Sequence, residues 1–149
     1  MSEANTERDP ARGSASQTGD PAGPATVRYQ VTNLDRAIAF YTKVLDFNLE
    51  MKSGSAFAMV SRAALHLILG GPGSSGARPM PDGRRQEPGG WNRIVLYVSD
   101  LETKIGELTA RGIHFRNSVE VGPGGKQILV DDPDGNPIEL HEGGASTLK

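Results

Sequence analysis

The pattern of apolar and polar positions occurs twice along the chain. Residues 27–35, which open with a β-branched and aromatic segment, align with residues 94–102. A second apolar segment, residues 65–71, aligns with residues 138–144 and places His66 opposite Glu139. Because self-similarity along a chain is the signature of duplicated structural units, we expect two copies of one module.

Each copy begins with a predicted strand that leads into an amphipathic helix. In the first copy, Thr32 or Asn33 caps a helix whose apolar stripe runs from Leu34 to Leu45, and Phe47 then begins the next strand. In the second copy, Ser99 and Glu102 form a capping box, and Gly112 ends the helix.

Three shorter strands follow each predicted helix. The second copy shows this best, because residues 127–131 and 138–141 are predicted strands of a hairpin, joined by a Pro- and Gly-containing turn at residues 132–136. The sequence therefore predicts an α+β fold of two tandem β-α-β-β-β modules.

Composition divides the chain into a folded part and polar ends. Residues 1–24 contain no Val, Ile, Leu, Phe, Tyr or Trp, so we expect a disordered tail. A single folded domain spans residues 25–142, with module one at 25–70 and module two at 91–142. The Gly- and Pro-rich linker at 71–90 is expected to be a loop or lid. We expect residues 143–149 to form a short flexible end.

Charge and cysteine content exclude several classes of protein. The 149 residues carry 18 acidic and 16 basic side chains and no cysteine. Disulfides and thiolate metal sites are therefore excluded, and a reducing cytoplasm is the expected location. The balanced charge argues against a nucleic-acid partner, and no apolar run is long enough for a membrane span.

Two segments resemble the vicinal oxygen chelate (VOC) superfamily: Asn-Leu-Asp-Arg-Ala-Ile-Ala-Phe-Tyr at 33–41 and Asp-Pro-Asp-Gly-Asn-Pro-Ile-Glu-Leu at 132–140. This superfamily includes glyoxalases, bleomycin-resistance proteins, fosfomycin-modifying enzymes, extradiol dioxygenases and epimerases. The resemblance implies mixed sheets that curl into a cup around the ligand. It also implies divalent-metal ligands on the first and last strands of each module.

The positions that match this ligand set are Thr26 and Arg93 on the first strands and His66 and Glu139 on the last strands. Threonine is a poor ligand for a transition metal, and an arginine cannot donate a lone pair. We therefore expect no metal and a Glu139–Arg93 ion pair in its place. The alternative is one divalent metal, such as Fe, Mn, Ni or Zn, held through His66 and Glu139.

Strand alternation suggests which side chains line the cup. Val27, Tyr29 and Val31 should pack beneath the helix, so the side chains between them should face either a ligand or solvent. His66 and Glu139 are the candidate catalytic pair for proton transfer. Trp91 is either a pocket wall or a core anchor, and His114 is expected to be structural. The candidate ligand-binding residues are Thr26, Arg28, Gln30, His66, Trp91, Arg93, Tyr97, Glu139 and His141.

These residues support two classes of function. The first is a metal-independent homodimer that binds or sequesters a small anionic or carbonyl-rich organic molecule, as resistance proteins do. The second is an enzyme of the glyoxalase or lyase, isomerase, or ring-cleaving dioxygenase type, with or without a metal. A purely structural module remains as a third interpretation if side chains fill the cup.

Overall fold

The computed structural model describes residue 19 and residues 23–143. The predicted tail 1–24 and end 143–149 therefore lie outside the described residues, apart from residues 19, 23, 24 and 143. Module one contains β1 (Thr26–Gln30), α1 (Leu34–Ala39), the π-helical turn η1 (Phe40–Val44), β2 (Asn48–Ser53), β3 (Phe57–Arg62) and β4 (Leu65–Gly70). A short 3-10 turn, η2 (Ser75–Ala77), follows. Module two contains β5 (Ile94–Tyr97), α2 (Leu101–Ala110), β6 (Glu120–Gly122), β7 (Gly125–Asp131) and β8 (Pro137–Glu142).

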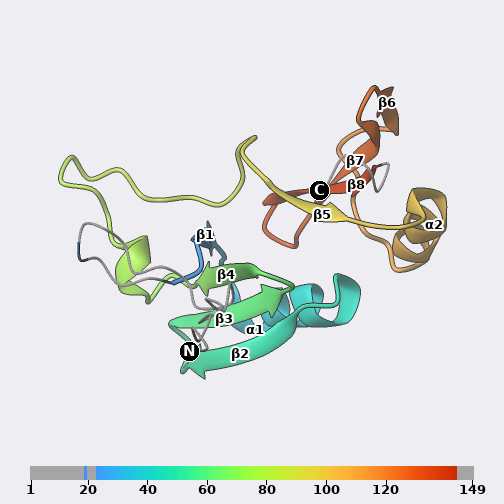
Figure 1. Ribbon diagram of the computed structural model, residues 1–149. Helices are drawn as coiled ribbons and strands as arrows, with labels where there is room; N and C mark the ends of the chain where they lie inside the picture. Colours follow the sequence, from blue (N-terminus) through green and yellow to red (C-terminus); the bar gives the residue numbers. More distant parts are fainter. Residues whose placement is uncertain (1–18, 20–22, 144–149) are drawn as a thin grey trace, which may run out of the picture.

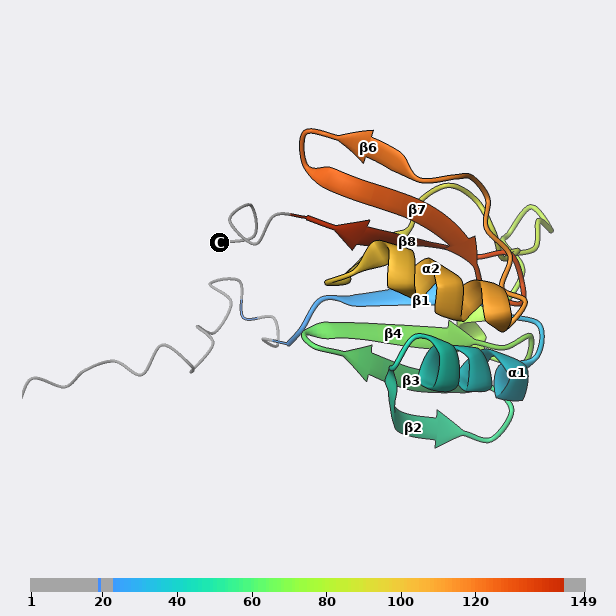
Figure 2. The ribbon, with the colours of Figure 1, turned by 90° about the vertical axis from the view of Figure 1, so that its right-hand side faces the viewer.

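Each module forms its own four-stranded mixed sheet. The strand orders are β1-β4-β3-β2 and β5-β8-β7-β6, so the two topologies are the same. The first strand of each module pairs parallel with the last, and the other pairs are antiparallel. Figures 1 and 2 show the two sheets with α1 and α2 on the same side of the molecule. The predicted α+β fold of two β-α-β-β-β modules is confirmed.

The two modules share one hydrophobic core. Alternate residues of the sheets, such as Leu67 and Leu69 on β4 and Ile138 and Leu140 on β8, are buried against the helices. The opposite faces of both sheets carry several of the candidate site residues, such as Thr26, His66 and Glu139, as period-two alternation requires. No helix in the described part of the chain is long and apolar enough to cross a membrane.

The helix starts differ in part from the expectation. Asn33 caps α1, because its side-chain oxygen accepts a hydrogen bond from Arg36 N at 2.9 Å. Asp100, not Ser99, caps α2, and its carboxylate accepts from Thr103 N at 3.1 Å. The expected Ser99 capping box is therefore wrong: the carboxylate one residue later reaches the same unpaired backbone donors.

Two further local expectations are also corrected. The first helix widens into η1, so β2 begins at Asn48 and Phe47 is instead a buried core residue. The linker, expected to have no helix, contains η2. Its Gly76 carbonyl accepts a hydrogen bond from Gln30 Nε2 at 2.9 Å, which holds the linker against β1.

Hydrogen bonds join the modules at the turn between β7 and β8. Tyr41 of module one donates to Asp132 Oδ2 at 2.8 Å, and Tyr29 donates to the Pro137 carbonyl at 2.8 Å. Burial raises the pKa of Asp132, and burial together with the Asp132 charge raises the pKa of Tyr41 well above its usual value. The tyrosine therefore stays protonated and donates its hydrogen bond.

The parallel register differs between the modules. Val31 N bonds to the Gly70 carbonyl, whereas the corresponding Val98 N bonds to the His141 carbonyl. When module one and module two are aligned on β1 and β5, Ile68 and not His66 occupies the position in module one that Glu139 has in module two. The expected equivalence is therefore displaced by two residues. An alternating pattern survives a two-residue shift unchanged, so His66 still belongs to the same sheet face.

Candidate functional site

Three charged side chains meet on the open face of the second sheet. Arg93, just before β5, donates to Glu139 Oε1 from Nε at 3.0 Å and from Nη2 at 2.9 Å. Glu139 on β8 is only 7% exposed. His141, two residues further along β8, places Nδ1 3.1 Å from Glu139 Oε2. The expected Arg93–Glu139 ion pair is thus present and is extended by His141.

The surroundings of His141 favour its protonated form. Its Nε2 lies 3.0 Å from the Gly124 carbonyl, so both ring nitrogens face acceptors. The Gly124 carbonyl, followed by the Glu139 carboxylate, raises the pKa of His141. A doubly donating imidazolium beside Arg93 gives two cations against one carboxylate. The protonated cluster therefore carries a net positive charge and attracts anions.

Aromatic and aliphatic side chains continue this face. Tyr97 and Val95 alternate with Arg93 along the chain, and Tyr97 is 50% exposed. The Tyr97 ring stands edge-on to His141, with 5.5 Å between ring centroids. The charged cluster therefore has an apolar wall that can cover the hydrocarbon part of an organic ligand.

Trp91 is not a core anchor, because 73% of its surface is exposed. Its ring lies 5.0 Å from the guanidinium carbon of Arg116, close enough for a cation–π contact. Arg116 also donates to the Gly90 and Gly135 carbonyls, each at 2.7 Å. The backbone before Trp91 is therefore fixed to the β7–β8 turn, although nothing in the sequence around Arg116 indicates this role.

A polar row crosses the open face of the first sheet. Thr26, His66 and Ser61 are directly paired neighbours on β1, β4 and β3. Ser61 donates to Glu50, and the Nδ1 atom of His66 is buried without a hydrogen-bond partner among the described residues. His66 therefore retains an unused polar atom.

The structure divides the predicted site residues into three groups. Arg93, Tyr97, Glu139 and His141 come together on the second sheet, with Trp91 just before Arg93. Thr26 and His66 are neighbours on the first sheet. Gln30 bonds to the linker, and Arg28 packs against it, since a Cβ at Gly76 would lie 2.5 Å from Arg28 Nη1.

His66 and His114 lie outside the Arg93–Glu139–His141 cluster. His66 and Glu139 lie on different sheets, and no hydrogen bond joins this candidate catalytic pair within one chain. The side chain of His114 is exposed, and its Nδ1 contacts Asp131 Oδ2 at 2.9 Å. A structural role for His114 fits this contact.

The residues at the expected metal positions do not fit a divalent cation. The Arg93 guanidinium bonds to one oxygen of Glu139, and His141 contacts the other. Thr26 supplies only a hydroxyl, which donates to the Pro24 carbonyl at 3.2 Å. Within residues 23–143, no three His, Asp or Glu side chains are grouped so as to hold a metal ion.

Solved structures of several proteins have this fold. A lactoylglutathione lyase from Agrobacterium tumefaciens has a TM-score of 0.64 and 22% identity, over 83% of this chain and 96% of that one. TnmS3, an antibiotic-binding protein from Streptomyces sp. CB03234, has a TM-score of 0.60 and 23% identity, over 84% and 100%. A superfamily member from Sphaerobacter thermophilus has a TM-score of 0.60 and 28% identity, over 79% and 96%.

Sequence comparison gives the family but no curated relative. No curated protein matches this chain. The family model described as Glyoxalase/Bleomycin resistance protein/Dioxygenase superfamily matches residues 23–140, which is most of the chain. Members of this superfamily often use divalent metals, and those similar to this chain include antibiotic-binding and lyase proteins. The chain belongs to the Glyoxalase/Bleomycin resistance protein/Dioxygenase superfamily, the family that its sequence resembles.

Proposed function

We propose that this protein binds a small anionic or carbonyl-rich organic molecule without a metal, in a resistance or sequestration role. The observation that carries the proposal is the chain of contacts from Arg93 through Glu139 to His141. A guanidinium at the position that the family resemblance matches to a metal ligand supplies fixed positive charge and directional donors. Such a group suits a carboxylate or carbonyl oxygen better than a cationic drug.

The metal-free part of this proposal is tested by metal analysis. Protein purified without chelator, and again after incubation with manganese, iron, nickel or zinc, is measured by mass spectrometry. We expect substoichiometric metal throughout, because Arg93 and His141 engage the Glu139 oxygens. Stoichiometric metal that is lost in Glu139→Gln would contradict the proposal.

The ligand class is tested with pairs of aromatic carboxylic acids and their methyl esters. The thermal shift on ligand addition is measured for the wild type and for Arg93→Gln, each relative to the same protein without ligand. We expect the acids to stabilise the wild type more than the esters, and Arg93→Gln to reduce the difference. The control is Arg84→Gln, on an exposed linker arginine whose ion pair is with Asp82. Equal shifts for acid and ester would contradict an anionic ligand.

We also propose that the complete cup forms between two copies of the chain. The first-sheet face with Thr26 and His66 and the second-sheet face with Arg93 and Glu139 would then meet across a homodimer. The support is that His66 and Glu139 share no contact within one chain, and that Val95 and Tyr97 are exposed on the open face. A two-fold dimer would complete two equivalent cups.

Mixed dimers distinguish a cup between chains from a cup within one chain. We expect light scattering to give the mass of two chains. We expect His66→Ala and Arg93→Gln each to lose ligand binding. When the two variants are unfolded and refolded together, they should regain about a quarter of the wild-type binding capacity, because half the dimers are mixed and each mixed dimer has one intact cup. A monomeric mass, or no regain of binding, would contradict the proposal.

A metal-free enzyme is the second candidate function. The observation that favours it is the buried, unpartnered Nδ1 of His66, which a substrate group could contact. With Glu139 in the same cup, His66 could move a proton beside a carbonyl in a lyase or isomerase reaction. Turnover of a carbonyl substrate that Glu139→Gln abolishes, with ligand binding retained, would favour this candidate over simple binding.

A further inference from the structure

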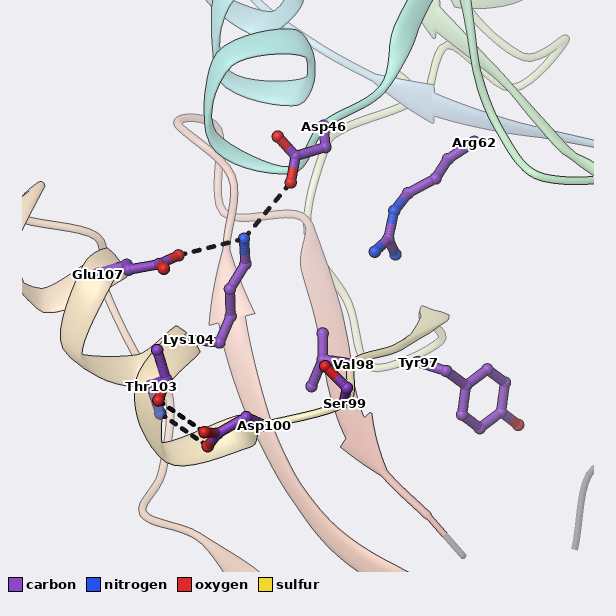
Figure 3. A pocket seen from close by; sticks show the side chains of 9 residues that line it. All are labelled: Asp46, Arg62, Tyr97, Val98, Ser99, Asp100, Thr103, Lys104 and Glu107. Atoms are coloured by element: carbon purple, nitrogen blue, oxygen red, sulfur yellow. Dashed lines mark hydrogen bonds and ion pairs between the residues drawn. The ribbon is translucent and has the colours of Figure 1, made fainter. Parts of the chain in front are cut away.

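A polar groove lies between the two modules, at the start of α2. We call it the seam groove, and its volume is about 470 Å³. This volume is within the range of small-molecule sites. Figure 3 shows side chains from both modules around the same hollow. Its lining residues are Asp46, Arg62, Tyr97, Val98, Ser99, Asp100, Thr103, Lys104 and Glu107.

Arg62 is the charged group of the seam groove that has no counterion. It ends β3, and its guanidinium extends into the hollow (Figure 3). No hydrogen bond or ion pair joins it to any residue that the structure describes, although five N–H donors are present. Arg62 is half-buried, and a guanidinium without a partner among the described residues is suited to a bidentate oxyanion.

Lys104 adds a second cation from the opposite module. Its side chain is 18% exposed, and Nζ lies 3.5 Å from Asp46 Oδ2 and 3.6 Å from Glu107 Oε2. These separations are longer than a normal hydrogen bond, so the ammonium retains donor capacity. The remaining carboxylate, Asp100, is turned toward the helix, where it accepts from the backbone and the hydroxyl of Thr103.

An apolar hollow adjoins the seam groove. Its volume is about 340 Å³, and it shares Arg62 and Tyr97 with the seam groove. The β3–β4 turn forms one side and β5 the other, with the lining side chains Ala63, Ala64, Leu65, Val95 and Leu96. Arg62 therefore stands between a hollow that contains charged groups and one that is mostly apolar.

We propose that the seam groove and this apolar hollow form a binding site for a small organic carboxylate with an aromatic or aliphatic body. The Arg62 guanidinium binds the carboxylate, with Lys104 contributing a second donor. The hydrocarbon part lies between the β3–β4 turn and β5, against Tyr97. This site is separate from the Arg93–Glu139–His141 cluster, although Val95 and Tyr97 belong to the walls of both.

Binding at this site connects the two modules. Arg62 and Asp46 belong to module one, and Lys104 and Tyr97 belong to module two. A ligand held by both modules stabilises their relative placement, because it binds the folded arrangement and not the unfolded chain. Through Tyr97, a ligand bound at this site is therefore positioned to change the affinity of the Arg93–Glu139–His141 cluster for its own ligand.

The test is an NMR titration of the full-length ¹⁵N-labelled protein with phenylacetate. Acetate tests the charge alone, and 2-phenylethanol tests the apolar body alone. We expect saturable shifts at the Val98 and Ser99 amides and at Arg62 Nε for phenylacetate, with weaker effects from the two partial ligands. Arg62→Gln should weaken phenylacetate binding at these amides by about tenfold or more.

Two matched variants separate this proposal from the proposed function. Arg85→Gln changes a linker arginine outside the groove and should leave the titration unchanged. Arg93→Gln should remove effects near Glu139 while the Val98 and Ser99 shifts persist. Absence of saturable shifts at millimolar phenylacetate, shifts that survive Arg62→Gln, or shifts confined to the Arg93 cluster would overturn the seam site.

Discussion

At the scale of single residues, the buried carboxylate of Glu139 depends on its neighbours for stabilisation. It is almost fully buried, and its oxygens are held by Arg93 on one side and His141 on the other. Taking a carboxylate out of water is costly unless its hydrogen bonds are replaced. The ion pair with Arg93 therefore replaces hydrogen bonds that Glu139 would otherwise make to water.

Removing the guanidinium should destabilise the fold. Arg93→Gln deprives Glu139 Oε1 of both donors, and we expect the free energy of unfolding to fall by about 1–3 kcal/mol. The double variant Arg93→Gln, Glu139→Gln should recover most of this loss, because no charge is left without a partner. Urea unfolding measures both effects. A loss as large for the exposed Arg84→Gln would contradict this account.

The raised pKa of His141 predicts a pH dependence with a definite sign. The folded state holds the imidazole proton more tightly than the unfolded chain does. The resulting stabilisation is fully present below the unfolded pKa of about 6.5 and is lost as pH rises through the higher folded pKa. Unfolding free energies of the wild type and His141→Gln, compared across this range, should differ more at the acidic end. A difference that grows toward alkaline pH would contradict the prediction.

At the scale of elements, the β6–β7 hairpin depends on one glycine. Gly125 has φ +125°, and a Cβ there would lie 2.0 Å from the Glu142 carbonyl oxygen. The hairpin therefore approaches the end of β8 too closely for any side chain. Its Gly124 carbonyl is the acceptor for His141, so the hairpin and the charged cluster are coupled.

Two glycine substitutions should have opposite effects on stability. Gly125→Ala should destabilise the fold by about 2 kcal/mol or more, because both the backbone angle and the space oppose a methyl group. Gly106→Ala, inside α2 with nothing within 4 Å, should stabilise it by about 0.5–1 kcal/mol. Thermal denaturation of both variants provides the measurement. Similar changes of the same sign would show that the hairpin can move aside.

The elements also show how far periodicity predicts this structure. Alternation and helical spacing predicted both modules, because each element buries one face. The apolar pattern did not reveal that Asp100, not Ser99, caps α2, or that the register differs by two residues between the modules. In both cases the expected and the observed arrangement have nearly the same apolar pattern.

At the scale of the whole molecule, the modules are fixed to each other by buried polar contacts as well as by their shared core. Tyr41 and Asp132, which are 91 positions apart in sequence, are joined by a hydrogen bond. Their surroundings raise the pKa of both side chains. Sequence reasoning indicated a tight turn at 132–136, but not that this turn holds module one. The partner across the seam has no signature in the local sequence.

Removing the Tyr41 hydroxyl should weaken the whole molecule and not one module alone. Tyr41→Phe leaves Asp132 with one donor fewer, and we expect a loss of about 1–2 kcal/mol in a single cooperative transition. The control is Tyr97→Phe, whose hydroxyl bonds to no residue that the structure describes, and whose effect should stay within about 0.5 kcal/mol. Two separate transitions in Tyr41→Phe would mean that the modules unfold independently.

The exposed Trp91 gives the protein its own optical reporter. It is the one tryptophan of the chain, and it lies on a backbone fixed through Arg116, just before the strand that carries Tyr97. Because its indole already contacts water in the native state, unfolding should shift its emission wavelength very little. A ligand that covers the ring should instead shift the emission to the blue, so that occupancy and unfolding can be followed separately in one unlabelled sample.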